Sequence, residues 1–276
     1  MNGIHIGPAF IHFYALMYLV GITLAIRITR RRWRAAGGDP ESHNQHTGPG
    51  AVSPPVGPTP HRACGRPCHT EQVGLYADQI LPRAINLALR GGEFAGPRAR
   101  VAAGLDGEVL EIGFGSGLNI PYYPAGLKRV QAVDPAAAGR KLAAGRAAGC
   151  AVPIEYVGSD AEALPVPDAS VDHVLSTWTL CTIPDAMRAL AEVRRVLRPG
   201  GAFRFVEHGL APDPGVARLQ QRLTPLQRRA FGGCRLNRRI DQLVAAAGLE
   251  LTRMDTYYMK GPRVLGYTFE GVAIRP

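Results

Sequence analysis

The sequence predicts an α/β fold in which a mostly parallel sheet of seven strands carries helices on both faces. Short apolar runs alternate with helical stretches from Glu108 onward, which is the order expected of strand–helix–strand units in a parallel sheet. A loop containing Gly113, Gly115 and Gly117 follows the first apolar run. Glycines at the end of a strand allow a tight turn and a close approach of the backbone to a ligand.

The individual elements follow from hydrophobic periodicity and from turn residues. We expect parallel strands at 108–113, 129–133, 153–157, 171–176 and 202–207. An antiparallel pair at 249–258 and 263–273 is expected to close the sheet. Helices are expected at 75–90, where Pro82 would introduce a kink, and at 136–148 and 185–197. The segment RPGG, Arg198 to Gly201, ends the last of these helices and leads into the next strand.

The N-terminal region differs in composition from the rest of the chain. An apolar run from Ala9 to Ile26 is followed by the arginine cluster RITRRRWR; its length approaches the roughly 20 residues that cross a bilayer. We therefore divide the chain into a transmembrane or signal-anchor segment (1–36), a Pro/Gly-rich flexible linker (37–73) and a folded domain (74–276). The arginines place the domain in the cytoplasm, anchored to the membrane; a downstream start would leave it soluble in the cytoplasm. A buried or amphipathic helix is the alternative for the apolar run.

The charge and the cysteine content limit the kinds of binding partner and the cellular compartment that we expect. Of 276 residues, 32 are Lys or Arg and 22 are Asp or Glu, which gives a net charge of +10 and favours anionic partners. The five cysteines are odd in number and show no repeating spacing, so we expect neither a disulfide framework nor an oxidising compartment. His61, Cys64, Cys68 and His69 match no common zinc spacing. We expect no metal, and we expect Cys181 and Cys234 to be small buried residues.

The segment VLEIGFGSGLNIPYY, Val109 to Tyr123, contains the pattern E-x-G-x-G-x-G formed by Glu111 and the three glycines. Leu118 stands where a dinucleotide-binding loop would have its third glycine, which disfavours an oxidoreductase. The pattern resembles the first motif of class I S-adenosylmethionine-dependent methyltransferases, which implies a Rossmann-like fold. A carboxylate beside the loop also suits the cationic sulfonium and ammonium groups of S-adenosylmethionine.

Further cofactor-binding residues are expected at the ends of the following strands, because open α/β sheets bind ligands at that edge. Asp134, with Pro135 beside it, ends the second strand, where a carboxylate can accept both ribose hydroxyls. The resemblance implies that Asp160 and Ala161 contact the adenine. It also places Ser176 and Thr177 along the methionine part of the cofactor.

A narrower resemblance covers about Tyr76 to Val272. The segments LCTIPDAMRALAEVRRVLRPGGAFRFVEHG, GGCRLNRR and VLGYTFEG are similar to the methyltransferase-like 7 thiol methyltransferase group and its bacterial relatives. This implies methylation of a small thiol acceptor by a protein with an N-terminal membrane anchor. Separately, Ile4 to Gly21 resembles the first membrane segment of prolipoprotein diacylglyceryl transferases, which implies a membrane segment and no lipid transferase activity.

His208, at the end of the fifth strand, is the candidate general base for a thiol acceptor; a histidine that fixes the following loop is the equal alternative. The arginine-rich stretch 211–239 is expected to form a helical insertion over the acceptor site, facing either solvent or the anionic membrane surface. A nucleic-acid methyltransferase would suit the charge, but no Asp/Asn-Pro-Pro-aromatic motif follows the fourth strand, so we expect no nucleic-acid partner. A membrane-anchored fusion product with a degenerate domain is the remaining alternative, and the intact Glu111, Asp134 and Asp160 disfavour it.

Overall fold

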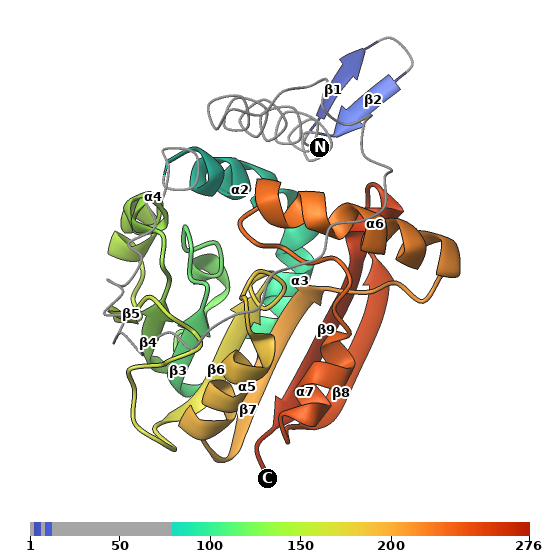
Figure 1. Cartoon of the computed structure of the whole chain (residues 1–276). Coiled ribbons are helices and arrows are strands. Elements are labelled where there is room, and N and C mark those ends of the chain that lie inside the picture. Colours follow the sequence, from blue (N-terminus) through green and yellow to red (C-terminus); the bar gives the residue numbers. More distant parts are fainter. Residues whose placement is uncertain (1–2, 7–8, 13–78) are drawn as a thin grey trace, which may run out of the picture.

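The computed structural model describes residues 3–6, 9–12 and 79–276 (Figure 1). In the last range, seven strands form one sheet in the order β5-β4-β3-β6-β7-β9-β8. The strands are β3 (Gly107–Ile112), β4 (Leu127–Val133), β5 (Ile154–Gly158), β6 (Val171–Thr177), β7 (Leu197–His208), β8 (Glu250–Tyr258) and β9 (Tyr267–Ile274). The helices are α2 (Leu81–Leu89), α3 (Gly92–Ala102), η3 (Ile120–Tyr122), α4 (Ala137–Ala148), α5 (Ala186–Val196), α6 (Pro214–Ala230), α7 (Ile240–Ala246) and α8 (Arg263–Gly266).

The pairing of the strands confirms the predicted mixed sheet. Strands β5, β4, β3, β6 and β7 are parallel, whereas β9 pairs antiparallel with both β7 and β8. The chain moves outward from β3 to β5 and then returns to β6 on the other side of β3. Ligands of doubly wound sheets bind at such a reversal, outside the carboxyl ends of the strands. Figure 1 shows α2 and α6 above this edge.

Two hydrophobic cores lie on opposite faces of the sheet. One contains α5 and α7, and the other contains α3 and α4. Helix α5 buries Ala186, Leu190 and Val193, which share one face at helical spacing. The side chain of Asp185 accepts a hydrogen bond from the backbone N–H of Arg188 at 3.0 Å and so caps the helix.

Helix α3 was not predicted, because Gly92, Gly96 and Pro97 disfavour a helix in the local sequence. Buried Phe94 and Val101 attach it to the sheet, and this tertiary packing outweighs the weak local propensity.

Pro82 lies in the first turn of α2, where the missing N–H of proline costs nothing; residues 75–78 of the helix predicted here lie outside the described residues. One predicted detail is wrong. The last strand does not begin at Arg263, because Gly261 and Pro262 precede a short helix, α8, and pairing starts only at Tyr267. The RPGG segment does follow the end of α5, but it belongs to the irregular beginning of β7.

Near the N-terminus, β1 (Gly3–Ile6) and β2 (Ala9–His12) form an antiparallel pair. The strand β2 occupies the first four residues of the apolar run for which we predicted a membrane span; the remainder of that run, the linker and the His61–His69 group lie outside the described residues. Within the described ranges, no helix has the length and apolar character needed to cross a bilayer.

Candidate active site

A cavity of about 500 Å³ opens at the carboxyl ends of β3, β4, β5 and β6. Its wall also includes parts of α2 and α3 and the turn at Gly232 and Gly233. Among the residues predicted to bind the cofactor, those that line the cavity are Gly113, Gly115, Asp134, Pro135, Asp160, Ala161 and Thr177. Glu111, Gly117 and Ser176 lie behind this wall.

The glycine loop adopts a conformation that only glycine accommodates well. The φ angles of Gly113, Gly115 and Gly117 are +71°, +54° and +73°. A Cβ on Gly113 would lie 1.9 Å from Oγ1 of Thr179, whereas a Cβ on Gly115 would have no atom closer than 3.8 Å. Gly113 is therefore required by the β6–α5 loop packed against it, and Gly115 leaves the wall of the cavity open.

Asp134 ties the glycine loop to the end of β4. One carboxylate oxygen accepts from the backbone N–H of Gly115 at 2.8 Å and the other from that of Ala136 at 2.7 Å. Burial raises the pKa of Asp134, and the two backbone hydrogen bonds oppose this rise. A carboxylate has about four lone-pair sites, so both oxygens can still accept from the ribose hydroxyls of a cofactor.

Asp160 lies at the exposed rim of the cavity beyond β5. Its carboxylate accepts a hydrogen bond from the backbone N–H of Glu162 at 2.8 Å, which fixes the turn containing Ala161. Asp160 and Asp134 follow the neighbouring strands β5 and β4, and both line the same cavity.

Glu111 is buried beneath the loop, with 1% of its surface exposed. It accepts hydrogen bonds from Nδ2 of Asn119 at 2.9 Å and from the hydroxyl of Tyr123. Glu111 does not line the cavity, which differs from the direct contact with a cationic ligand that we expected. Its hydrogen-bond partner Asn119 does line the cavity.

Arg98 of α3 is a cavity residue that the sequence analysis missed. Its guanidinium donates to Oδ1 of Asn119 at 2.6 Å and to Oγ1 of Thr177 at 2.9 Å, and its Nε has no hydrogen-bond partner. Burial lowers the pKa of Arg98 to about 10. An incompletely paired cation in the wall suits a carboxylate ligand. Because α3 was not predicted, nothing in the local sequence marked this arginine.

Ser176 is fully buried and donates a hydrogen bond to Glu207 at 2.6 Å. The Glu207 carboxylate also accepts from the backbone N–H groups of Thr179, Leu180 and Cys181 at 3.0, 3.0 and 3.2 Å. Ser176 therefore supports the β6–α5 loop and does not line the cavity, while its neighbour Thr177 does. Burial raises the pKa of Glu207.

Replacing Glu111 by glutamine will weaken the dependence of stability on pH. Burial raises the pKa of Glu111 from 4.5 to about 7. Between these values the folded protein holds a proton that the unfolded chain has lost, so the free energy of unfolding falls as the pH rises. Across this pH range the free energy of unfolding falls by about 3 kcal/mol in total. Urea unfolding should show Glu111→Gln gaining stability relative to the parent protein between about pH 4.5 and pH 8; a constant difference across this range would contradict the assignment.

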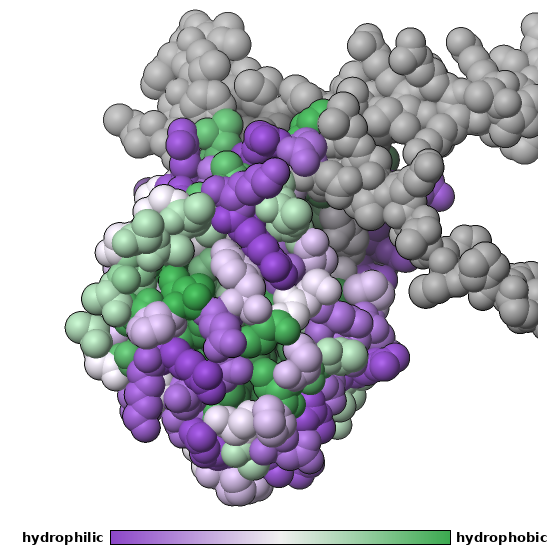
Figure 2. Space-filling view, turned by 90° about the vertical axis from the view of Figure 1, so that its left-hand side faces the viewer, coloured by the Kyte–Doolittle hydropathy of each residue, from purple (hydrophilic) through white to green (hydrophobic). Residues whose placement is uncertain are grey.

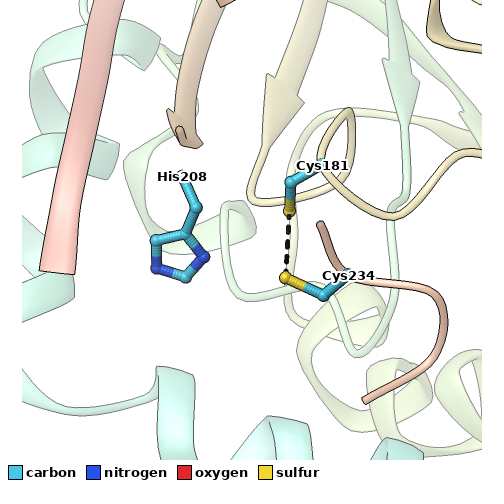
Figure 3. A group of neighbouring side chains, drawn as sticks. All are labelled: Cys181, His208 and Cys234. Carbon is cyan, nitrogen blue, oxygen red and sulfur yellow. Dashed lines mark hydrogen bonds between the residues drawn. The ribbon is translucent and has the colours of Figure 1, made fainter. Parts of the chain in front are cut away.

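A second cavity, of about 70 Å³, adjoins the first and shares Trp178, Thr182 and Phe231 with it. Cys181, His208 and Cys234 line it together. Cys181 and Cys234 are buried, as predicted, with their sulfur atoms 3.8 Å apart (Figure 3). The pKa of Cys234 lies well below that of an ordinary thiol, because Cys181 and His208 stabilise its thiolate.

Apolar side chains border the approach to the two cavities. Ile80, Ile85 and Leu87 at α2 are exposed by 46%, 37% and 39%, and Ile85 lines both cavities. Figure 2, seen from the side of α4 and β5, shows hydrophobic residues at the surface between hydrophilic ones. An apolar approach to a site with polar groups inside suits a lipophilic small molecule.

Comparisons with known proteins agree with this architecture. Residues 110–205 match the family model described as a methyltransferase domain. Human thiol S-methyltransferase TMT1A is 32% identical over 203 residues, which cover 70% of this chain and 80% of the relative. Rat thiol S-methyltransferase TMT1B is 37% identical over 136 residues, or 47% of this chain and 54% of the relative.

A solved S-adenosylmethionine-dependent methyltransferase from Mesorhizobium loti has the same fold, with a TM-score of 0.51 and 18% identity, covering 67% of this chain and 98% of that one. The methyltransferase-domain match and the identity to TMT1A confirm the predicted enzyme class and cofactor. The chain belongs to the class I S-adenosylmethionine-dependent methyltransferases, in the family that contains TMT1A and TMT1B.

Proposed function

We propose that this enzyme methylates the sulfur of a small lipophilic thiol. The observation that carries the proposal is the small cavity lined by Cys181, His208 and Cys234, which adjoins the cofactor cavity and is reached past apolar side chains. The names of the two mammalian relatives support a thiol acceptor.

The larger cavity offers complementary groups for each part of the cofactor. Asp134 accepts from the ribose hydroxyls and Asp160 lies at the adenine end. Arg98 pairs with the methionine carboxylate, since it is the buried cation of the cavity wall. Thr177 and Asn119 hold Arg98 in place. This arrangement directs the methyl group toward Trp178 and Thr182, where the two cavities share a wall.

The transfer is an in-line displacement from a sulfonium, and alignment of the acceptor supplies much of the rate. The acceptor sulfur gains the methyl group as the bond between the methyl carbon and the sulfonium breaks. A thiolate is the reactive form of the acceptor, so the site must promote loss of the thiol proton. His208 is the catalytic residue for this step, because its imidazole lines the acceptor cavity.

Methyl transfer from labelled S-adenosylmethionine will be fast with small apolar thiols and slow with amines and phenols of the same size. Replacing His208 by glutamine should lower kcat for thiols by about 100- to 10,000-fold. The affinity for S-adenosylhomocysteine should remain unchanged in this variant.

His173→Gln is the matched control, because His173 contacts Asp106 at 3.1 Å and lines neither cavity. Preferential methylation of amines or phenols would contradict the thiol proposal, and full activity of His208→Gln would contradict the role of His208.

We further propose that the enzyme works at the cytoplasmic membrane surface, anchored by its N-terminal segment. The exposed arginines Arg222, Arg228 and Arg229 on α6 support this, because arginines near an anionic membrane surface contribute about 1 kcal/mol each. Arg238 has a different role: it donates to the carbonyl oxygens of Ile183 and Pro184 at 2.5 and 3.0 Å.

Changing Arg222, Arg228 and Arg229 to glutamine should weaken binding of residues 71–276 to anionic vesicles by about 100-fold. The control variant changes Arg129, Arg194 and Arg253 to glutamine; these arginines are exposed elsewhere on the domain. This variant has the same net charge, and its binding to anionic vesicles should weaken less. Equal losses in the two variants would show a general charge effect and contradict a membrane-facing α6.

A further inference from the structure

Three potential metal ligands from separate parts of the chain meet at the acceptor cavity (Figure 3). Cys181 lies in the loop after β6, His208 is the last residue of β7, and Cys234 follows α6. All three are buried, and one ligand atom from each lies within 4.8 Å of the others. Among the described residues, this is the group of His, Cys, Asp and Glu side chains that converges closely enough to hold a metal ion.

We propose that Cys181, His208 and Cys234 bind a zinc ion and leave its fourth position open to the acceptor cavity. Tetrahedral zinc with bonds of about 2.3 Å to sulfur separates two thiolates by about 3.8 Å. The two sulfur atoms lie 3.8 Å apart. The imidazole nitrogen completes the set, since the three ligand atoms lie within 4.8 Å of one another. Sites with three protein ligands and an open position are typical of catalytic zinc.

His208 provides an independent observation. Its Nδ1 is buried and has no hydrogen-bond partner, although buried polar atoms are almost always paired. In Figure 3 the ring nitrogen next to the point of attachment, Nδ1, is on the side that faces the two sulfur atoms. A cation between the three side chains would give this nitrogen its partner.

The backbone around the cluster holds both cysteines in place. The backbone N–H of Arg235 donates to the carbonyl of Cys181 at 2.9 Å, which joins the two cysteine segments. Gly233 has a φ of +90°, and a Cβ there would lie 2.8 Å from the carbonyl oxygen of Thr182. Glu207 accepts from the N–H of Cys181. Such hydrogen bonds around the ligands fix their orientation in metal sites.

Charge balance and ligand type favour zinc over harder cations. Two thiolates and a neutral imidazole neutralise a divalent ion, which makes its burial acceptable. Thiolate and imidazole ligands select zinc over magnesium or calcium, which prefer oxygen. We expected no metal because no single segment of the sequence has a common zinc spacing, whereas these ligands come from three separate segments.

This inference rests on the proposed thiol methylation and specifies how the thiolate forms. The acceptor R–SH binds zinc as the fourth ligand and releases its proton to solvent. Its sulfur electron pair then attacks the methyl carbon, and the electrons of the broken carbon–sulfonium bond stay on sulfur as S-adenosylhomocysteine. The product thioether carries no charge, binds zinc weakly and leaves. With zinc bound, His208 is a ligand of the metal, and zinc promotes loss of the thiol proton in place of a histidine base.

The test is zinc binding to the full chain, first stripped of metal and reduced, then titrated in competition with a chromogenic chelator. Cobalt titration adds the visible absorption of a tetrahedral thiolate site. We expect Cys181→Ser and Cys234→Ser to lose affinity by more than the roughly 10- to 100-fold that follows loss of a partner behind a ligand. Cys150→Ser is the matched control, since Cys150 is a free cysteine outside both cavities. Unchanged S-adenosylhomocysteine binding shows that each variant is folded.

Cys64→Ser/Cys68→Ser, in the N-terminal part of the chain, should leave this zinc affinity unchanged. The proposal is overturned if zinc does not bind, if binding survives in Cys181→Ser and Cys234→Ser, or if it disappears in Cys64→Ser/Cys68→Ser. Methylation assays separate the two proposals: absence of thiol methylation with zinc bound at this cluster contradicts the proposed function alone. Equal thiol methylation by stripped and zinc-loaded protein contradicts the catalytic role of the metal alone.

Discussion

Replacing Asp134 by alanine will lower the affinity for S-adenosylhomocysteine by about 100-fold or more. The carboxylate accepts from the backbone N–H groups of Gly115 and Ala136, and we propose that it also accepts from the ribose hydroxyls. Hydrogen bonds to a charged group contribute about 1.5–3 kcal/mol each, and loss of two corresponds to this fold-change or a larger one. Calorimetric titration of the full chain measures the effect directly.

Asp168→Ala serves as the control for this titration. Asp168 is 77% exposed, pairs with Arg195 at 2.6 Å and does not line the cofactor cavity. The same loss of a carboxylate there should leave the affinity unchanged. If a folded Asp134→Ala protein binds the cofactor product as tightly as its parent, the placement of the ribose beside this residue is wrong.

Much of the sheet and of the glycine loop was predictable from the sequence, because each is determined by contiguous residues. The short apolar run at 108–113 indicates a strand, and the glycines that follow indicate a tight loop. Asp134 followed from a general property of doubly wound sheets, which bind ligands at the carboxyl ends of their strands. Asp160 and Thr177 were implied by the resemblance to class I methyltransferases. Each of these residues lines the cavity.

The sequence was less informative about which strand-end residues line the cavity and which are buried behind it. The sequence placed Glu111 and Ser176 at strand ends, but it did not show which way each side chain would point. Successive residues of a strand face opposite sides, so a one-residue difference separates cavity-lining Thr177 from buried Ser176. Arg98 was not predicted as a site residue, because its helix contains Gly96 and Pro97 and is stabilised by tertiary contacts.

The residues that form the acceptor cavity were even less predictable from the sequence. Cys181, His208 and Cys234 are separated along the chain by a helix, a strand and α6. Their meeting depends on the insertion after β7 folding back over the sheet edge, which no local pattern encodes. The sequence therefore predicts Cys181 and Cys234 as buried residues and His208 as a candidate base, but it does not predict that the three meet.

Replacing Glu207 by alanine will destabilise the fold by about 3 kcal/mol or more, because each buried donor left without an acceptor costs about 1–3 kcal/mol. The carboxylate accepts from Ser176 and from three consecutive N–H groups of the β6–α5 loop. Without it, four buried donors lose their acceptor. The same loop contains Trp178, whose φ of +51° is unfavourable for a residue with a side chain. Urea unfolding of the full chain measures the loss.

The expected loss is larger than that of Ser176→Ala, which removes one donor and leaves Glu207 bound to the three backbone groups; a net hydrogen bond of this kind contributes about 1 kcal/mol. Glu207→Ala should also weaken S-adenosylhomocysteine binding, because Trp178 and Thr179 of the released loop line the cofactor cavity. Equal stability of Glu207→Ala and Ser176→Ala would show that the three backbone N–H groups find other acceptors. The β6–α5 loop also carries Cys181. The ordered conformation of this loop therefore links cofactor binding to the acceptor cavity.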